Sequence, residues 1–306
     1  MTGNNVNSTQ MMDEWDCEHF SPYRSDGKLY GFVCVVTSST QPIGKAIVNE
    51  LAAHGAACIY ACCFHPSSPP TSFFDEINTK HPNTKIIPYP VEITSEEDTL
   101  ALIDEVLNQW GRLDVFTLLP TTPGPSTIST TTSPTILSTL EHNTLPAFYA
   151  LKRAPAAMQK TLTQKGNYPN AAPKPVSYGS IIVVNTMGGT GISANNEDRV
   201  KGEKSVAGPA FTMASHAVLG VVKSGVSVLR GTGVRINCIS AGWIDDGSED
   251  GREKSKQVNG LDRPGRPEEI GRVAGFLASG FSSFMTGANL VVDGGASAVA
   301  GMNVPV

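Results

Sequence analysis

Short apolar runs rich in valine and isoleucine alternate along this chain with longer amphipathic segments. Because the runs are almost continuously apolar, each strand should be buried on both faces of its sheet. Strands that alternate with helices in this way predict an α/β fold, with one doubly wound parallel sheet and helices on both faces. The runs that predict strands lie at residues 31–36, 57–63, 85–91, 115–119, 180–184, 234–239 and 290–292.

Two segments between these runs carry clear helix signals. Residues 43–54 place apolar side chains on one side and are followed by Gly55, a residue that often ends helices. Residues 95–110 repeat apolar side chains at helical spacing, and Ser95 can cap their first turn. We therefore expect a helix over each segment.

The remaining segments are polar and divide the chain. Residues 1–27 predict a polar N-terminal arm, and residues 28–306 a single domain. Loops are expected where Pro, Ser, Thr and Gly gather, because these residues favour turns. In a doubly wound sheet, the segments that follow the carboxyl ends of the strands line the ligand crevice. Residues 190–207 and 245–262 follow two such strand ends, so they are candidate substrate lids. The loops are the connection before residue 85 and residues 121–139, 166–178, 190–207 and 245–262.

Composition excludes several classes of protein. The chain has 306 residues and a net charge of −5, which argues against a partner that is a nucleic acid. No stretch reaches the ~18 consecutive apolar residues of a membrane span, and the polar N-terminus is unlike a signal peptide. Cysteine and histidine lack metal-ligand spacing, so no metal is expected. These features predict a cytoplasmic protein with no membrane span.

Several long motifs resemble the short-chain dehydrogenase/reductase (SDR) family. They are RPGRPEEI at 263–270, FLAS at 276–279, TGANLVVDGG at 286–295 and GVRINCIS at 233–240. The resemblance covers about residues 28–300, and residues 166–173 and 179–184 are similar to reductases of filamentous fungi. It implies a single Rossmann-like domain, NAD(P) binding, and hydride transfer through an Asn-Ser-Tyr-Lys set.

The cofactor positions that the resemblance implies are degenerate. Of the family's phosphate turn only Thr37 and Gly44 remain, and Pro42 has no N–H to donate to a phosphate. Cys62 stands where an acid or a base would select the ribose. We therefore predict no cofactor, or weakly bound NADP or NAD. The family's cofactor contacts fall on Thr37, Ser38, Gly44, Cys62, Glu92 and Ile93.

The catalytic positions have changed as well. Asn143 is retained and Thr186 keeps a hydroxyl, but Phe211 and Ser215 replace the Tyr and the Lys. Phenylalanine has no proton to give, and serine supplies no charge to lower a pKa. Asp246 replaces a Thr that contacts the nicotinamide and should repel a pyrophosphate. The substrate pocket is expected to be lined by Leu118, Leu119, Met187 and Trp243.

Three functions remain open for such a chain. It can be a repurposed enzyme that performs a cyclisation, isomerisation or dehydration on a largely apolar small molecule, in fungal-type secondary metabolism. It can be an NAD(P)H-dependent reductase with an unconventional proton source, such as water or Asp246. It can also be a non-catalytic partner subunit of an active reductase. The family implies a homo-oligomer, and none of the six histidines is predicted to be a strong general base.

Overall fold

A seven-stranded, all-parallel sheet forms the centre of the computed structural model, which describes residues 24, 26–63, 71–120, 128–186, 208–245 and 259–299. The strand order is β3-β2-β1-β4-β5-β6-β7. This confirms the predicted doubly wound α/β fold. The strands are β1 (Val33–Val36), β2 (Cys58–Cys62), β3 (Lys85–Tyr89), β4 (Val115–Leu118), β5 (Gly179–Thr186), β6 (Val234–Ala241) and β7 (Asn289–Val292).

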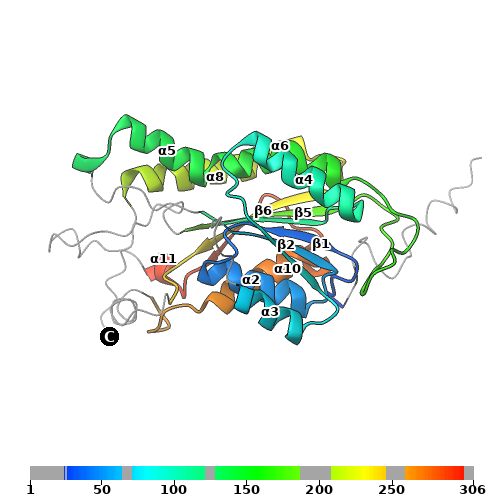
Figure 1. Ribbon diagram of the computed structural model, residues 1–306. Helices are drawn as coiled ribbons and strands as arrows, with labels where there is room; N and C mark the ends of the chain where they lie inside the picture. The colour runs from blue at the N-terminus through cyan, green and yellow to red at the C-terminus, as the bar shows by residue number, and fades with distance from the viewer. Residues whose placement is uncertain are drawn as a thin grey trace, which may run out of the picture.

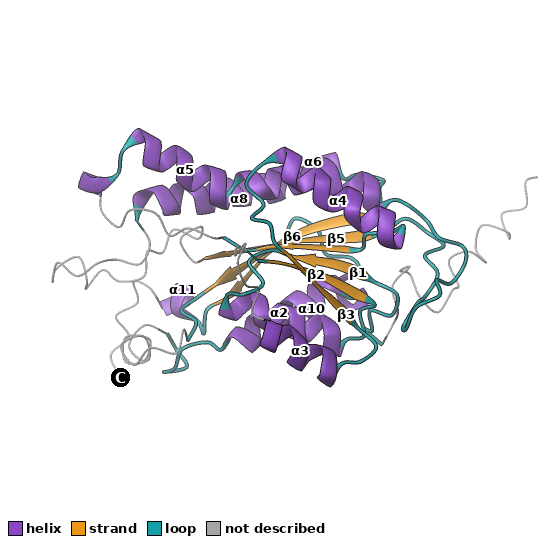
Figure 2. Ribbon diagram, viewed as in Figure 1, coloured by secondary structure: helices purple, strands orange, loops and turns teal. Residues whose placement is uncertain are grey.

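Helices cover both faces of the sheet (Figures 1 and 2). Helices α2, α3 and α10 lie on one face, and α4, α5, α6 and α8 lie on the other. Short 3-10 helices lie at Ile128–Thr130 and Gly280–Ser282. The helices are α2 (Pro42–Ala53), α3 (Thr71–Lys80), α4 (Glu96–Trp110), α5 (Ser133–Asn143), α6 (Leu145–Met158), α8 (Pro209–Val228), α10 (Pro267–Ala278) and α11 (Ala296–Val299).

Alternate residues of each strand enter different cores, because successive side chains point to opposite faces of a sheet. In β1, Cys34 and Val36 pack with α2 and α10, whereas Val33 and Val35 pack with α4 and α6. All four are buried. This double burial explains why the strands are almost purely apolar in sequence.

Strands β5 and β6 each extend two residues beyond the carboxyl ends of the apolar runs that predict them. They pair with each other as far as Thr186 and Ala241. The added residues are polar or small, but they are held: Asn185 Nδ2 donates to the Ser215 carbonyl at 3.0 Å, and Ser240 Oγ contacts Asn289 Oδ1 at 2.7 Å. These hydrogen bonds stabilise the extension of both strands at their carboxyl ends.

The connection before β3 contains a helix, α3, where we expected only a loop. Phe74 and Ile77 are buried against the α2 side of the sheet, and their spacing places both on one helix face. The Pro/Ser-rich residues that precede α3 hide this short apolar pattern in the sequence. The helix is therefore a product of tertiary packing rather than of a strong local signal.

The outer edge of β3 offers little to a further strand. Lys85 donates its N–H inward to Ala57 of the β2 side, so the backbone nitrogens of Ile86 and Pro88 face outward. The Ile86 N–H is bound by Asn78 Oδ1 of α3 at 3.2 Å. Pro88 has no N–H.

The expected loop at residues 121–139 is wrong from residue 128 onward. A 3-10 turn is followed by α5, which begins after Thr132. Thr132 caps the helix by accepting from Thr135 N, while Thr135 Oγ1 accepts from Thr132 N at 2.8 Å. A run of Thr, Ser and Pro thus supplies N-terminal caps here rather than a loop.

A fully buried ionic cluster lies at the opposite end of the sheet from the strands' carboxyl ends. Asp114 contacts Arg112 at 2.8 Å and Lys174 at 3.0 Å, and accepts from the Val33 N–H at 2.8 Å. Lys174 Nζ also donates to the Met158 carbonyl at 2.6 Å. The cluster ties the predicted loop 166–178 to the sheet.

Helix α8 is the one described helix that is long and apolar enough to cross a membrane by length and composition alone. One third (33%) of its most apolar window is buried, and the helix packs against α5, β5 and β6. We therefore describe α8 as part of the helix layer that covers one face of the sheet.

Candidate functional site

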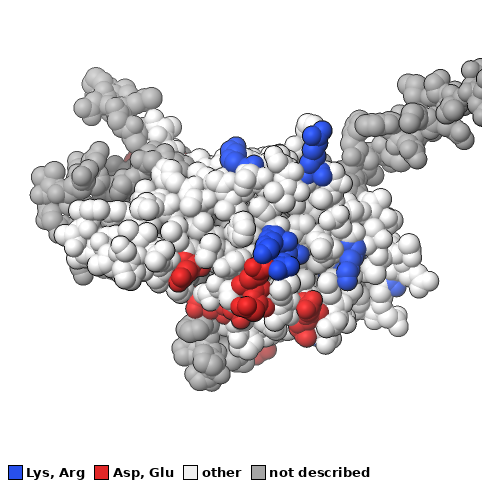
Figure 3. Space-filling model, turned by 90° about the horizontal axis from the view of Figure 1, so that it is seen from above, with Lys and Arg blue, Asp and Glu red and all other residues white. Residues whose placement is uncertain are grey.

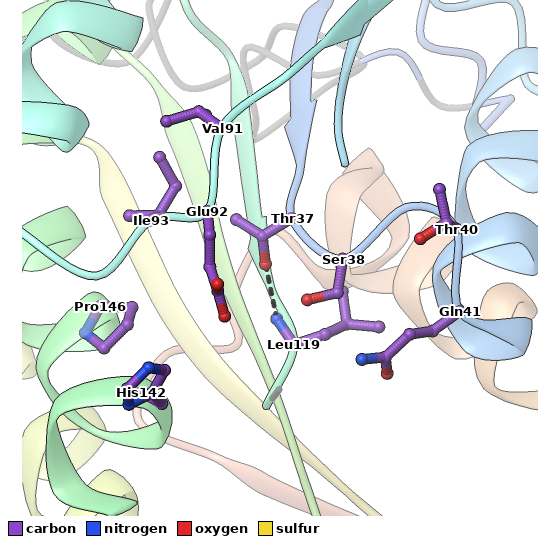
Figure 4. A pocket seen from close by; sticks show the side chains of 10 residues that line it. All are labelled: Thr37, Ser38, Thr40, Gln41, Val91, Glu92, Ile93, Leu119, His142 and Pro146. Carbon is purple, nitrogen blue, oxygen red and sulfur yellow. Dashed lines mark hydrogen bonds between the residues drawn. The ribbon is translucent and has the colours of Figure 1, made fainter. Parts of the chain in front are cut away.

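A cavity of about 230 Å³ lies where the carboxyl ends of β1, β3 and β4 meet the break between α5 and α6 (Figure 4). The described part of its lining is mostly hydroxyl, amide and apolar groups, with one carboxylate and one imidazole, and this part includes no Lys or Arg. The predicted residues Thr37, Ser38, Glu92, Ile93 and Leu119 are brought together here. The full lining is Thr37, Ser38, Thr40, Gln41, Val91, Glu92, Ile93, Leu119, His142 and Pro146.

The turn between β1 and α2 forms one wall and is tightly constrained. Ser38 has a left-handed backbone, with a φ of 49°. Thr37 joins the turn to β4, because its Oγ1 accepts from the Leu119 N–H at 2.9 Å. A Cβ atom on Gly44 would lie 2.2 Å from the Ser38 carbonyl oxygen, so only glycine fits beneath the turn.

Replacing Gly44 by alanine should destabilise the protein, because the turn's backbone must move to admit the new methyl group. We expect Gly44→Ala to lower the free energy of unfolding by about 1–3 kcal/mol, measured by urea denaturation. The matched control is Gly220→Ala in α8, where no atom lies within 4 Å of an added Cβ. That change should stabilise by about 0.5–1 kcal/mol. Equal losses in both variants would contradict the steric argument.

Cys62 lies behind the turn rather than in the cavity. Ser39 Oγ and Ser39 N both bind its carbonyl, at 2.8 and 2.9 Å. The Cys62 side chain is 1% exposed, and burial raises the pKa of its thiol far above the ordinary range. The position that would select a ribose therefore offers no group to a ligand.

The segment after β3 forms the wall opposite the turn. Ile93 is buried and packs with α4, which anchors the segment. The Glu92 side chain projects into the cavity in Figure 4. Among the described residues it has no ion-pair partner, so its negative charge is available to whatever occupies the cavity.

His142 lines the cavity although its place in the sequence did not suggest it. Pro146, four residues later, cannot donate the N–H that would continue the helix, and its ring would clash with the His142 carbonyl. The helix breaks at Thr144, between α5 and α6. The break leaves His142 and Pro146 side by side at the cavity wall (Figure 4). A proline four residues after a histidine is the signal that could have drawn attention to it.

The residues expected at the family's catalytic positions lie on α5, β5 and α8. Asn143 is 8% exposed at the end of α5, beside His142, and Thr186 ends β5. Phe211 and Ser215, one helical turn apart on α8, are 7% and 2% exposed. Phe211 supplies neither a hydroxyl nor a charge, and Ser215 supplies a hydroxyl but no charge.

Other predicted site residues lie elsewhere. Leu118 points into the core formed with α4 and α6 rather than into the cavity. Trp243 lines a second cavity of about 230 Å³, together with Arg263 and Asp293. Met187 and Asp246 lie outside the described residues, as do the candidate lid 190–207 and most of 245–262.

No group of three metal-ligating side chains occurs within the ranges that the structure describes. The cavity's own donors are one carboxylate and one imidazole. The chemistry available from the described lining is therefore hydrogen bonding, proton transfer and apolar contact.

The sequence matches known proteins over almost the whole domain. A family model described as enoyl-(acyl carrier protein) reductase matches residues 38–297. An L-rhamnose-1-dehydrogenase of Scheffersomyces stipitis is 27% identical over 278 residues, which are 88% of this chain and 97% of the relative. A short-chain dehydrogenase of Penicillium roqueforti is 25% identical over 281 residues, covering 86% and 95%.

Solved structures share the fold. An NADPH-dependent 3-quinuclidinone reductase from Rhodotorula rubra superposes with a TM-score of 0.71 at 22% identity, covering 88% of this chain and 92% of that one. A short-chain type dehydrogenase/reductase from Mycobacterium marinum gives a TM-score of 0.73, covering 89% and 97%. These likenesses support the architecture described above.

Proposed function

Because this chain belongs to the short-chain dehydrogenase/reductase family, we propose that it is a repurposed member that performs a non-redox step on a small, largely apolar molecule. The proposal is supported by the pair Phe211 and Ser215, which the motif resemblance aligns with the family's proton donor and its charged partner. Loss of one acid-base group costs ~10²–10⁴-fold in rate. Loss of both removes the family's route for hydride transfer.

The described lining fits a dinucleotide poorly. A pyrophosphate carries two negative charges, yet the cavity has no Lys or Arg and presents the carboxylate of Glu92. Pro42 opens α2 and offers no N–H. Cys62 is buried and its carbonyl is bound by Ser39. We therefore derive no step that depends on NAD(P).

A cyclisation, isomerisation or dehydration needs a shaped wall and a few polar handles. Ile93, Val91 and Leu119 provide apolar surface, and Ser38 and Thr40 provide hydroxyls. Holding a substrate in its reactive conformation can by itself supply a large part of the rate. This division of roles supports the non-redox reaction and requires no oxidant or reductant.

A reductase remains the second candidate, because relatives are named as dehydrogenases or reductases and the β1–α2 turn keeps a tight backbone. Thr37 and Gly44 hold that turn in place. Titration of NADPH and NADH against the fluorescence of the intact protein separates the two. We expect no saturation up to about 1 mM, and a dissociation constant in the micromolar range would overturn the non-redox proposal.

Restoring the family's pair gives a second, independent test. Phe211→Tyr with Ser215→Lys should not create carbonyl reduction by NADPH, because the cofactor site itself has changed. The measurement is NADPH oxidation at 340 nm with cyclohexanone as the ketone. The single variant Phe211→Tyr is the control for folding, since it adds only a hydroxyl. Reduction at about 100-fold above background would show that a competent cofactor site had been retained.

Association with another copy of this chain would use the outer face of the helices that cover the sheet. Seen from above, charged side chains gather in the middle as adjacent groups of opposite sign (Figure 3). Glu96 of α4 pairs there with Arg153 and, at 2.9 Å, with Lys152 of α6. Helix α5 exposes the apolar side chain of Leu137, and this supports the homo-oligomer that the family implies.

A further inference from the structure

The side chain of His142 is fixed in one orientation by a hydrogen bond within α5. Its Nδ1 lies 2.7 Å from the Ser138 carbonyl oxygen. A carbonyl only accepts, so Nδ1 carries the hydrogen and the neutral ring keeps its lone pair on Nε2. Nε2 makes no hydrogen bond with a described residue. The ring thus presents a base to the cavity.

Glu92 occupies the wall across from this base. The two side chains are the ionisable groups among the ten that line the cavity, and both reach into it in Figure 4. Leu119 and the hydroxyl of Ser38 line the same cavity.

We propose that His142 is the proton-transfer residue of this cavity and that its substrate is an uncharged carbonyl compound. Nε2 takes a proton from a carbon next to the carbonyl: the C–H bond breaks, an N–H bond forms, and the electron pair moves onto the carbonyl oxygen. The hydroxyls of Ser38 and Thr40 can donate to that oxygen. When the substrate is a β,γ-unsaturated ketone, the anion is a dienolate that shares the electron pair with the γ-carbon. The imidazolium returns the proton to that γ-carbon, and the C=C bond moves into conjugation with the carbonyl. The result is an isomer, and nothing is oxidised or reduced.

This inference rests on the proposed non-redox function and gives it a substrate class. An anionic substrate is disfavoured because Glu92 would repel it. An uncharged ketone has no such penalty, and apolar contacts with Val91 and Ile93 favour its carbon skeleton. His142 was among the residues that the sequence did not single out as a base.

The test follows exchange of the α-protons of cyclohexanone in D₂O by NMR, with the intact protein as catalyst. The wild type should accelerate exchange over buffer, and His142→Gln should lower the catalysed rate about 100-fold. The unfolding midpoint of each variant, measured by circular dichroism, checks that it remains folded.

His216→Gln is the matched control. His216 Nδ1 also bonds the carbonyl four residues earlier, at 2.9 Å from Thr212, but the ring is exposed on α8. Its replacement should leave exchange within about 2-fold. If the wild type does not exceed buffer, or if folded His142→Gln keeps the full rate, the assignment is wrong. NADPH titration reports separately on the non-redox function, so the two can fail independently.

Discussion

Asp114→Asn is expected to lower the free energy of unfolding by about 3–5 kcal/mol, because breaking a buried ion pair leaves an uncompensated charge. Asp114 is fully buried and lies 2.8 Å from Arg112 and 3.0 Å from Lys174. Asparagine keeps the shape but removes the one negative charge between two cations. Guanidinium chloride denaturation, followed by circular dichroism, measures the change.

The matched control is Asp26→Asn. Asp26 also pairs with an arginine, since Arg24 Nε donates to its carboxylate at 3.0 Å, but both side chains are exposed. An exposed pair contributes ~0–1 kcal/mol, so this variant should hardly change the midpoint. A loss below 1 kcal/mol for Asp114→Asn would mean that the buried cluster tolerates an uncompensated charge.

The cluster also gives stability a pH dependence. Burial raises the pKa of Asp114, but the charges of Lys174 and Arg112 outweigh burial, and the pKa lies below its ordinary value. A carboxyl whose pKa is lowered by folding stabilises the protein above its unfolded pKa of ~3.9 and loses that contribution as pH falls through the folded pKa. The difference between wild type and Asp114→Asn should therefore shrink below about pH 4.

Arg235→Met should have the next largest effect, a loss of about 3 kcal/mol. The Arg235 guanidinium is buried, and it donates to the Leu277 carbonyl at 2.8 Å and to the Ser282 carbonyl and hydroxyl at 3.0 Å each. Hydrogen bonds to a charged group contribute ~1.5–3 kcal/mol each, and the cost of burying the charge offsets part of their sum. Methionine fills the volume but makes none of these bonds.

Arg235 joins β6 to the end of α10, so its replacement should destabilise the packing of the C-terminal part of the fold. The control Arg272→Met lies on the exposed side of α10 and should change stability by less than about 0.5 kcal/mol. Urea denaturation of both variants gives the comparison. Equal midpoints for the two variants would show that the buried guanidinium contributes nothing.

The sheet could be predicted from sequence because a buried parallel strand carries its own signature. The apolar runs place all seven strands, and each strand has one or both ends shifted by one or two residues. Helix α3 could not be placed, since its two buried side chains follow a stretch that resembles a linker. Helix α5 was hidden because Thr132 reads equally well as a turn residue and as a helix cap.

The candidate site was predictable only where it coincides with the family's motifs. Thr37, Glu92 and Leu119 line one cavity because they follow strand ends, and the carboxyl ends of parallel strands lie along the same side of the sheet. His142 was not, because its position depends on a helix break that Pro146 creates. Leu118 was expected to line the substrate pocket but is buried in the core. Successive residues at a strand end point to opposite faces of the sheet, and it is Leu119 that lines the cavity.

The edge formed by β3 has a consequence for what happens between molecules. An open strand edge can recruit a strand of another chain and start irreversible stacking into fibres. Here Asn78 already occupies the outward N–H of Ile86, and Pro88 has none to offer. An incoming strand would meet no free donor over this stretch. In a concentrated solution the β3 edge is therefore protected against pairing with a strand of another molecule. The β7 edge, where Val291 is exposed, is the edge at which such pairing could begin.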